Sequence, residues 1–180
     1  MNSTERSSQP GLRVREGVRS TMAQAPSSSI TAAMQQGFTP RRILVPVNGS
    51  PTDDEAVRLA CRLARRQRAK VYVITILEVK RSLALGTVQD AEVERGEALL
   101  DRAETIGAEL DVEVDTELLQ AREAGPAIVD EVREWQADLA VIGMPFRQRF
   151  GEFHMGKTAP YVLKFAPCRT LLFREPLQQP

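Results

Sequence analysis

Residues 42–52 read RILVPVNGSPT, and this stretch decides the fold class of the chain. Its first six residues form a short, almost continuous apolar run, which is typical of a strand buried on both faces of a parallel sheet. The Asn48-Gly49 pair then turns the chain. Ser50 or Thr52 can cap a following helix, which Pro51 in the first turn would favour. The stretch therefore predicts a strand, a turn and a helix of an α/β protein.

The alternation of strands and helices continues toward the C-terminus. We expect helices at 52–68, 90–108, 125–135 and shortly after residue 155, and strands at 71–79, 111–118, 137–143 and 169–173. Strands that alternate with helices imply an open five-stranded parallel sheet with helices on both faces. Acidic residues at every second place of 111–118 indicate an edge strand with one wet face. With the third strand at an edge, the simplest strand order is 3-2-1-4-5.

The chain divides into a tail and one domain. Residues 1–39 are rich in Ser, Thr, Gln, Gly and Pro and have no sustained period of 2 or 3.6, so we expect a disordered N-terminal tail. The domain should span 40–176, and 177–180 should form a short C-terminal tail. A domain of this size can bury a core without metals or disulfides.

Composition excludes several classes of function. The 180 residues carry a formal net charge of zero, which does not favour nucleic acid or an anionic membrane as a partner. The longest apolar runs are far shorter than the roughly 20 residues that span a bilayer, so a cytoplasmic location is expected. Two distant cysteines and one histidine cannot supply the four ligands of a structural zinc site, and no metal is expected.

A ligand site is expected where the strand order reverses, between the first and fourth strands. Ligands of open α/β sheets bind at this switch point, beyond the carboxyl ends of the strands. The segments concerned are 46–50 and 143–158.

These segments resemble the universal stress protein family. The matching stretches are ILVPVNGSPTDDEAV at 43–57, VYVITILEV at 71–79, AGPAIVDEV at 124–132, DLAVIG at 138–143 and GKTAPYVLKFAPCRTLLF at 156–173. They follow one another in the family's order and cover the whole predicted domain. The resemblance implies a Rossmann-like fold of the adenine nucleotide alpha hydrolase type.

Many members of that family bind ATP through a G-x2-G-x9-G-[ST] motif, and this chain keeps its spacing. Gly143 and Gly156 occupy the first and third glycine places, whereas Phe146 stands at the second and Lys157 stands where Ser or Thr is usual. In binders, a residue at the place of Asn48, usually Asp, contacts the ribose. The candidate nucleotide site implied by the resemblance comprises Pro46, Val47, Asn48, Ile76, Gly143, Phe146, Arg147, Gly156, Lys157 and Thr158.

The departures from the motif act in opposite directions. A side chain at position 146 would hinder the close backbone approach to a phosphate that glycine permits. Lys157, by contrast, brings a cation to the helix end where phosphates would lie, and Arg147 and Arg149 could add to it.

Residues 151–158, GEFHMGKT, also match the Walker A pattern GxxxxGK[ST]. A P-loop follows its strand directly and opens a long helix, and a second strand supplies an acidic residue for Mg²⁺. Here about seven residues separate Gly143 from Gly151, and no acidic strand follows. The context argues against a P-loop ATPase.

Three functions of different classes remain. The first is a cytoplasmic stress-response module that binds ATP or another adenine nucleotide, with Mg²⁺ if the ligand is ATP, and acts as a homodimer paired through 169–173. The second is a protein-interaction module of the same fold that binds no nucleotide. The third is an enzyme such as an ATPase, although no residue at the switch point is an evident base or nucleophile.

Overall fold

A computed structural model describes residues 37–79, 90–146, 148–149 and 152–175. The residues from Thr39 onward form one compact unit, separate from those before it. The predicted tails at 1–39 and 177–180 lie almost wholly outside the described residues, so they stay predictions. No helix in the described part of the chain is long and apolar enough to cross a membrane.

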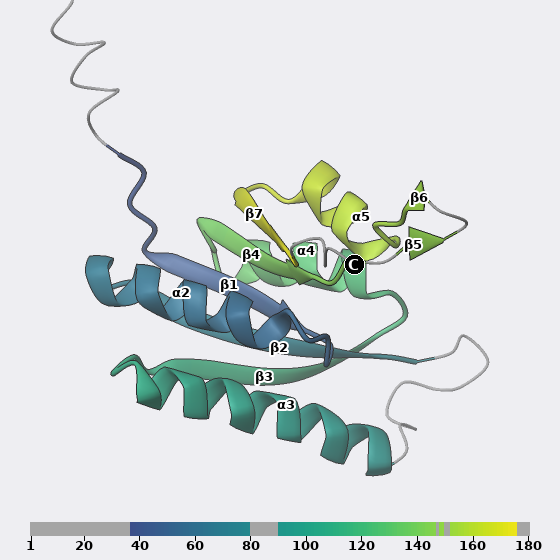
Figure 1. The fold of residues 1–180 in the computed structure, drawn as a ribbon, viewed down its shortest axis with the longest axis horizontal. Coiled ribbons are helices and arrows are strands. Elements are labelled where there is room, and N and C mark those ends of the chain that lie inside the picture. Colours follow the sequence, from purple (N-terminus) through teal and green to yellow (C-terminus); the bar gives the residue numbers. More distant parts are fainter. Residues whose placement is uncertain (1–36, 80–89, 147, 150–151, 176–180) are drawn as a thin grey trace, which may run out of the picture. The chain divides into compact units, whose positions relative to one another are not determined.

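The larger unit alternates strands and helices. Its elements are β1 (Arg42–Val47), α2 (Asp53–Gln67), β2 (Lys70–Glu78), α3 (Asp90–Glu109), β3 (Val114–Ala121), α4 (Ala124–Glu134), β4 (Leu139–Met144), β5 (Gln148–Arg149), β6 (Glu152–Phe153), α5 (Thr158–Phe165) and β7 (Arg169–Arg174). Five strands form a parallel sheet in the order β3-β2-β1-β4-β7, which confirms the predicted topology with β7 as the fifth strand. Figure 1 shows α2 and α3 on one side of this sheet, with α4 and α5 on the other.

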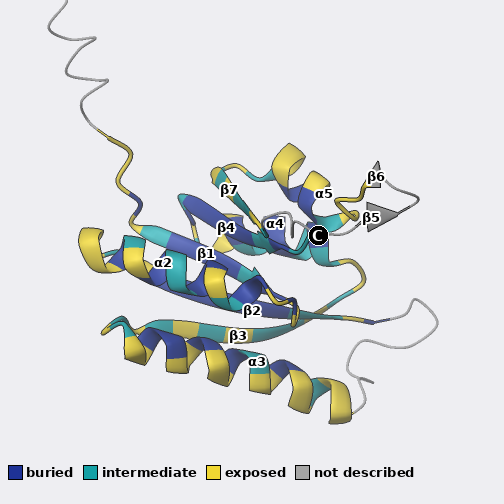
Figure 2. Ribbon diagram, viewed as in Figure 1, coloured by how far each residue is buried: buried dark blue, intermediate teal, exposed yellow. Residues whose placement is uncertain are grey.

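Two hydrophobic clusters fix the layers, because successive residues of a buried strand face opposite sides. Ile43, Val45 and Val47 of β1 pack with α2 and α3, whereas Leu44 packs with α4 and α5. This is why residues 43–47 read as a continuous apolar run. The dark blue of β1 and the mixed teal and yellow of β3 in Figure 2 contrast a central strand with an edge strand.

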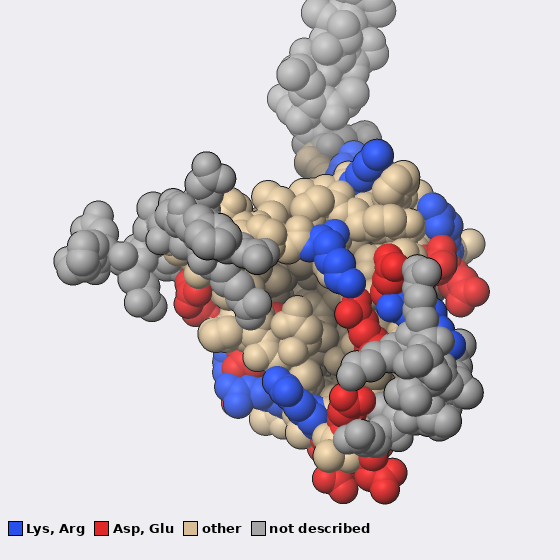
Figure 3. All heavy atoms as spheres, turned by 90° about the vertical axis from the view of Figure 1, so that its right-hand side faces the viewer, with Lys and Arg blue, Asp and Glu red and all other residues tan. Residues whose placement is uncertain are grey.

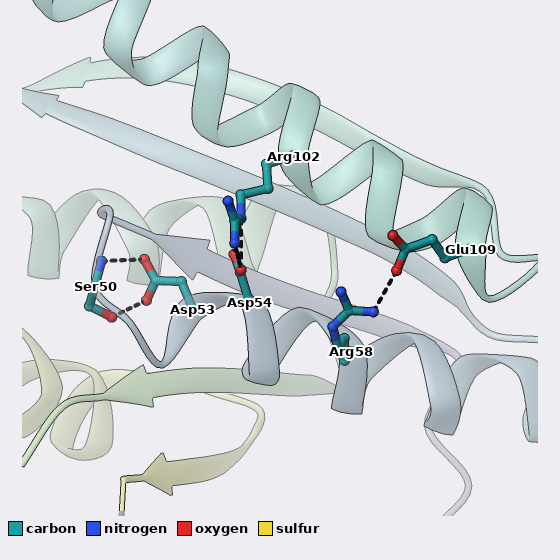
Figure 4. Close-up of polar contacts among 6 residues, drawn as sticks. All are labelled: Ser50, Asp53, Asp54, Arg58, Arg102 and Glu109. Carbon is teal, nitrogen blue, oxygen red and sulfur yellow. Dashed lines mark hydrogen bonds and ion pairs between the residues drawn. The ribbon is translucent and has the colours of Figure 1, made fainter.

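Two ion pairs join α2 and α3 on their outer faces (Figure 4). Arg102 Nε donates to both carboxylate oxygens of Asp54 at 2.7 Å, and Arg58 lies 2.6 Å from the carboxylate of Glu109. These side chains are partly exposed, so solvent screening keeps the contribution of each pair to stability small. The pairs connect two helices whose apolar sides already share one core.

The third strand begins later than the alternation predicted. Helix α3 continues to Glu109, and Asp111 has a φ of +54°, a turn conformation that ends the helix. The N–H of Val112 then donates to the Gly107 carbonyl at 2.9 Å. Asp111 therefore belongs to the turn that ends α3, Glu113 lies in the connection after it, and β3 starts at Val114. Its edge position is as predicted.

An antiparallel hairpin of two-residue strands follows β4 and was not predicted. Gln148 pairs with Phe153, and Arg149 pairs with Glu152. This segment was expected to be a plain loop, because its sequence has neither strand periodicity nor an Asn-Gly or Asp-Gly turn. The Walker A-like pattern runs through β6, so it does not form the single loop between strand and helix that a P-loop requires.

Candidate functional site

The two central strands separate toward their carboxyl ends. Strand β1 pairs with β2 over six residues, but it pairs with β4 only at Ile43 and Leu44. Beyond Leu44, Pro46 and Val47 of β1 diverge from Ile142 and Gly143 of β4. This is the switch point of the sheet, where ligands of open α/β folds bind.

A pocket of about 290 Å³ lies at this divergence. The residues that line it are Pro46, Val47, Asn48, Ile76, Ala124, Ile128, Ile142, Gly143, Met144, Pro145, His154, Met155, Gly156, Lys157, Thr158 and Ala159. The lining is mostly apolar, as is usual for small-molecule sites. Figure 3 faces this end of the sheet and shows a hollow whose visible walls are mostly neither acidic nor basic, with charged side chains of both signs around it.

Most of the residues expected at the site are brought together here. The lining includes Pro46, Val47, Asn48, Ile76, Gly143, Gly156, Lys157 and Thr158, which come from β1, β2, β4 and the start of α5. Arg147 lies outside the described residues. Phe146 is described, but it does not line the pocket.

The Phe146 ring instead packs under the hairpin. It stacks on Phe153 with ring centroids 5.5 Å apart and planes at 10°, and the guanidinium of Arg174 lies 5.2 Å from its centroid. Its backbone N–H donates to a carboxylate oxygen of Glu175 at 3.3 Å. The residue at the second glycine place of the motif therefore anchors the segment after β4 to the end of β7.

Asp53 organises the turn between β1 and α2. Its Oδ2 accepts hydrogen bonds from the backbone N–H groups of Asn48, Gly49 and Ser50 at 2.7, 2.8 and 3.0 Å, and its Oδ1 accepts one from the Ser50 hydroxyl. Figure 4 shows Asp53 pointing back toward Ser50. A carboxylate bonded to three N–H groups is a strong local anchor. The sequence suggested that Ser50 or Thr52 caps the helix, but the Thr52 side chain bonds to Ser50 rather than to a helix N–H.

The glycine at the end of β4 is explained by this turn. A Cβ atom at Gly143 would lie 3.0 Å from the Thr52 carbonyl oxygen and 3.2 Å from Asp53 Oδ1. Packing against the α2 side of the sheet therefore favours glycine at position 143. This reason is independent of any approach of a ligand to the same residue. At Gly156 the requirement differs, because φ is +70° and open space surrounds the position of a Cβ atom.

Lys157 is the only charged residue among the described residues that line the pocket. It precedes α5 directly, and its own side chain does not cap the helix. The ammonium Nζ lies 3.7 Å from Glu78 Oε1 at the end of β2, and the two side chains are 74% and 41% exposed. The same Glu78 oxygen accepts the N–H of Ala124, the first residue of α4, at 2.8 Å. Glu78 therefore contacts the starts of two helices, at Ala124 and at Lys157, and both of these residues line the pocket.

Sequence reasoning did not identify several of these residues. Ala124, Ile128 and His154 were not among the residues expected at the site, although all three line the pocket. Glu78 belongs to no sequence motif. Its role depends on a hydrogen bond to the first residue of α4, which the sequence pattern does not show. Within the described ranges, no group of three or more His, Cys, Asp or Glu residues is placed to hold a metal ion.

Comparison with known proteins agrees with the fold. Residues 39–174 match the model of the universal stress protein family. The universal stress protein MJ0531 of Methanocaldococcus jannaschii is 27% identical over 145 residues, which cover 77% of this chain and 85% of that protein.

Two solved structures extend the comparison. A universal stress protein from Archaeoglobus fulgidus in complex with dAMP is 26% identical, with a TM-score of 0.60 over 75% of this chain and 98% of that one. A universal stress protein family protein from Arabidopsis thaliana with AMP bound shares the fold at 15% identity, with a TM-score of 0.55 over 76% of this chain and 93% of that one. Because the family model covers the domain from before β1 to the end of β7, this chain belongs to the universal stress protein family.

Proposed function

We propose that this protein binds an adenine nucleotide in the pocket between β1 and β4. The main support for the proposal is that the pocket has an apolar wall on one side and the ammonium of Lys157 at the start of a helix. Ile76, Ile128 and Ile142 offer apolar surface to a base, and Lys157 lies at the start of α5. The dAMP complex of the Archaeoglobus relative supports a ligand of this chemistry.

The expected pose follows from the lining residues. The phosphate lies on the backbone N–H groups of Gly156, Lys157 and Thr158, where the helix dipole and the ammonium both favour an anion. The ribose faces Asn48 and Gly143. The base meets the apolar residues Val47 and Ile76. Asn48 is exposed and can accept a hydrogen bond, although a neutral amide makes a weaker one than a carboxylate would.

Calorimetry with AMP and with ATP, each with and without Mg²⁺, tests this function. Replacing Lys157 by Ala should weaken nucleotide binding by about 1–3 kcal/mol, the cost of losing a charge-assisted hydrogen bond. Lys164→Ala is the matched control, since Lys164 lies on the last turn of the same helix and is outside the pocket lining. Equal affinities of the parent and the Lys157→Ala protein would contradict the phosphate assignment. An absence of binding would instead favour a protein-interaction module.

We also propose that the protein acts as a cytoplasmic stress-response homodimer paired through β7. Strand β7 is an edge of the sheet, and Leu171 is 38% exposed on it, with the exposed side chains of Leu163 and Phe165 on neighbouring α5. An apolar edge strand is a surface that proteins cover or blunt. Light scattering should report a dimer at micromolar concentration, and Leu171→Pro should give monomer or insoluble protein. A monomeric parent chain would overturn this assignment.

A further inference from the structure

Three sets of backbone N–H groups lie near the carboxyl end of the sheet, and each has the geometry that binds anions. The first is the turn at Asn48, Gly49 and Ser50. Its three N–H groups already donate to the carboxylate of Asp53, which is only 5% exposed. A ligand phosphate cannot use this turn without displacing a buried, fully bonded carboxylate.

The second set is the start of α4 at the pocket wall. The N–H of Ala124 donates to Glu78 Oε1 at 2.8 Å, and Ala124 itself lines the pocket. A helix N-terminus attracts an anion through its dipole and its unpaired N–H groups. Here Glu78 supplies that anion from the end of β2.

The third set is the start of α5. Within the described residues, no side chain accepts a hydrogen bond from the N–H of Lys157, Thr158 or Ala159. The Lys157 ammonium stands beside these groups, 3.7 Å from the same Glu78 oxygen that caps α4. The N–H groups of the first set and the Ala124 N–H of the second set thus donate to carboxylates of the protein itself. The third set lies at the pocket, and the nearby Lys157 ammonium is 3.7 Å from the carboxylate of Glu78.

We infer that the site accepts a nucleotide with one phosphate group and that Glu78 sets this limit. The inference rests on the proposed function. One phosphate can take the α5 start and draw Lys157 away from Glu78. Further phosphates would extend beyond the N–H groups at the start of α5 and meet the negative charge of Glu78. Like charges repel, with an energy that solvent reduces for a side chain 41% exposed, so Glu78 favours AMP-like over ATP-like ligands by a modest factor.

The variant Glu78→Gln removes the negative charge of this side chain and keeps an acceptor for the hydrogen bond at the start of α4. Its amide oxygen can still accept the Ala124 N–H, while the negative charge beside Lys157 is removed. Glu113→Gln is the matched control, because Glu113 lines a separate groove with Arg65 and Lys70 near the opposite end of β2. Thermal melts of both variants would verify that the fold is kept.

Calorimetry of the full chain with adenosine, AMP and ATP, without divalent cations, is the test. We expect the parent to bind AMP at least about tenfold more tightly than ATP. The Glu78→Gln protein should gain about tenfold in ATP affinity, less in AMP affinity and nothing in adenosine affinity, while Glu113→Gln matches the parent.

The possible outcomes separate the one-phosphate limit from the proposed binding of an adenine nucleotide. A parent that binds ATP as tightly as AMP overturns the one-phosphate limit. A Glu78→Gln protein that gains equally for both overturns the role of Glu78. Nucleotide binding stands in either case. If adenosine, AMP and ATP all fail to bind the parent, the proposed function itself fails. The ratio of AMP to ATP affinity in the parent tests the one-phosphate limit even if the Glu78→Gln protein does not fold.

Discussion

The carboxylate of Asp53 lies against Gly143, so that a Cβ atom at position 143 would come within 3.2 Å of Asp53 Oδ1. The contact joins the turn after β1 to the end of β4, the two segments that flank the pocket. It acts on the α2 side of the sheet, opposite α4. The turn therefore has a fixed position next to the point where the two strands separate.

Replacing Gly143 by Ala should destabilise the domain. The added methyl group would meet the backbone carbonyl of Thr52 at 3.0 Å, and a backbone atom cannot move aside as a flexible side chain can. Overpacking of this kind costs about 1–3 kcal/mol. Urea denaturation of the parent and the Gly143→Ala protein measures the change. An unchanged unfolding midpoint would mean that the turn adjusts without cost.

Asp53→Ala should cost more than about 3 kcal/mol of stability, because three N–H groups and a hydroxyl would lose a charged acceptor. Glu55→Ala is the control, since Glu55 is an exposed acid in the same helical turn and should change stability by less than about 0.5 kcal/mol. Similar denaturation midpoints for the two variants would contradict the role given to Asp53.

The sequence predicted the fold well because its strands and helices differ in hydrophobic period. Residues 42–47 could be assigned to a central strand, and the acids at Asp115 and Glu117 marked an edge strand. The start of β3 was misplaced because Asp111 and Glu113 continue the alternation while the chain is still leaving α3. Alternation shows which face of a strand is wet, but it does not show where a preceding helix ends.

The candidate site was predicted only in part, because its polar groups interact across long stretches of sequence. Glu78 and Ala124 are 46 residues apart, and their hydrogen bond depends on parallel packing of β2 and β3. The residue pattern did not show that the hydrogen bonds of Asp53 run backward to the turn at residues 48–50. A motif indicates which residues meet a ligand, but not which of the protein's own charges compete with it.

The cysteines should react slowly in the native protein. Burial raises the pKa of Cys61 from 9.0 to about 11 and also raises the pKa of Cys168. Thiol reagents attack the thiolate, whose fraction at pH 8 falls about a hundredfold for such a shift. A Cys168→Ala protein treated with a chromogenic disulfide at pH 8 should therefore label slowly until urea is added. Rapid labelling without urea would show that Cys61 is accessible.

We propose that residues 40–176 fold without the N-terminal tail. Residues Thr39–Pro180 form a compact unit with two hydrophobic clusters of their own. A chain that starts near Gln36 should melt within about 1 °C of the full chain, because tail residues of this composition cannot build a core. A loss of several degrees in a calorimetric scan would show that the tail contributes to stability.

The last prediction concerns Phe146, which stands where the family motif has its second glycine. Its ring stacks on Phe153 beneath Arg174 and does not line the pocket.

If the ring only anchors the hairpin, Phe146→Ala should lower stability by about 1–2 kcal/mol and leave AMP affinity within about twofold of the parent. Phe146→Gly should leave binding unchanged or tighten it, since glycine lets the backbone approach a phosphate more closely.

The competing hypothesis makes the ring a plug, and ATP would then bind only after its removal. Calorimetry with AMP and ATP on the parent and both variants distinguishes the two, because an anchor changes stability and a plug changes affinity. An ATP affinity that rises more than about tenfold in both variants would show that the ring closes the site rather than supporting its edge.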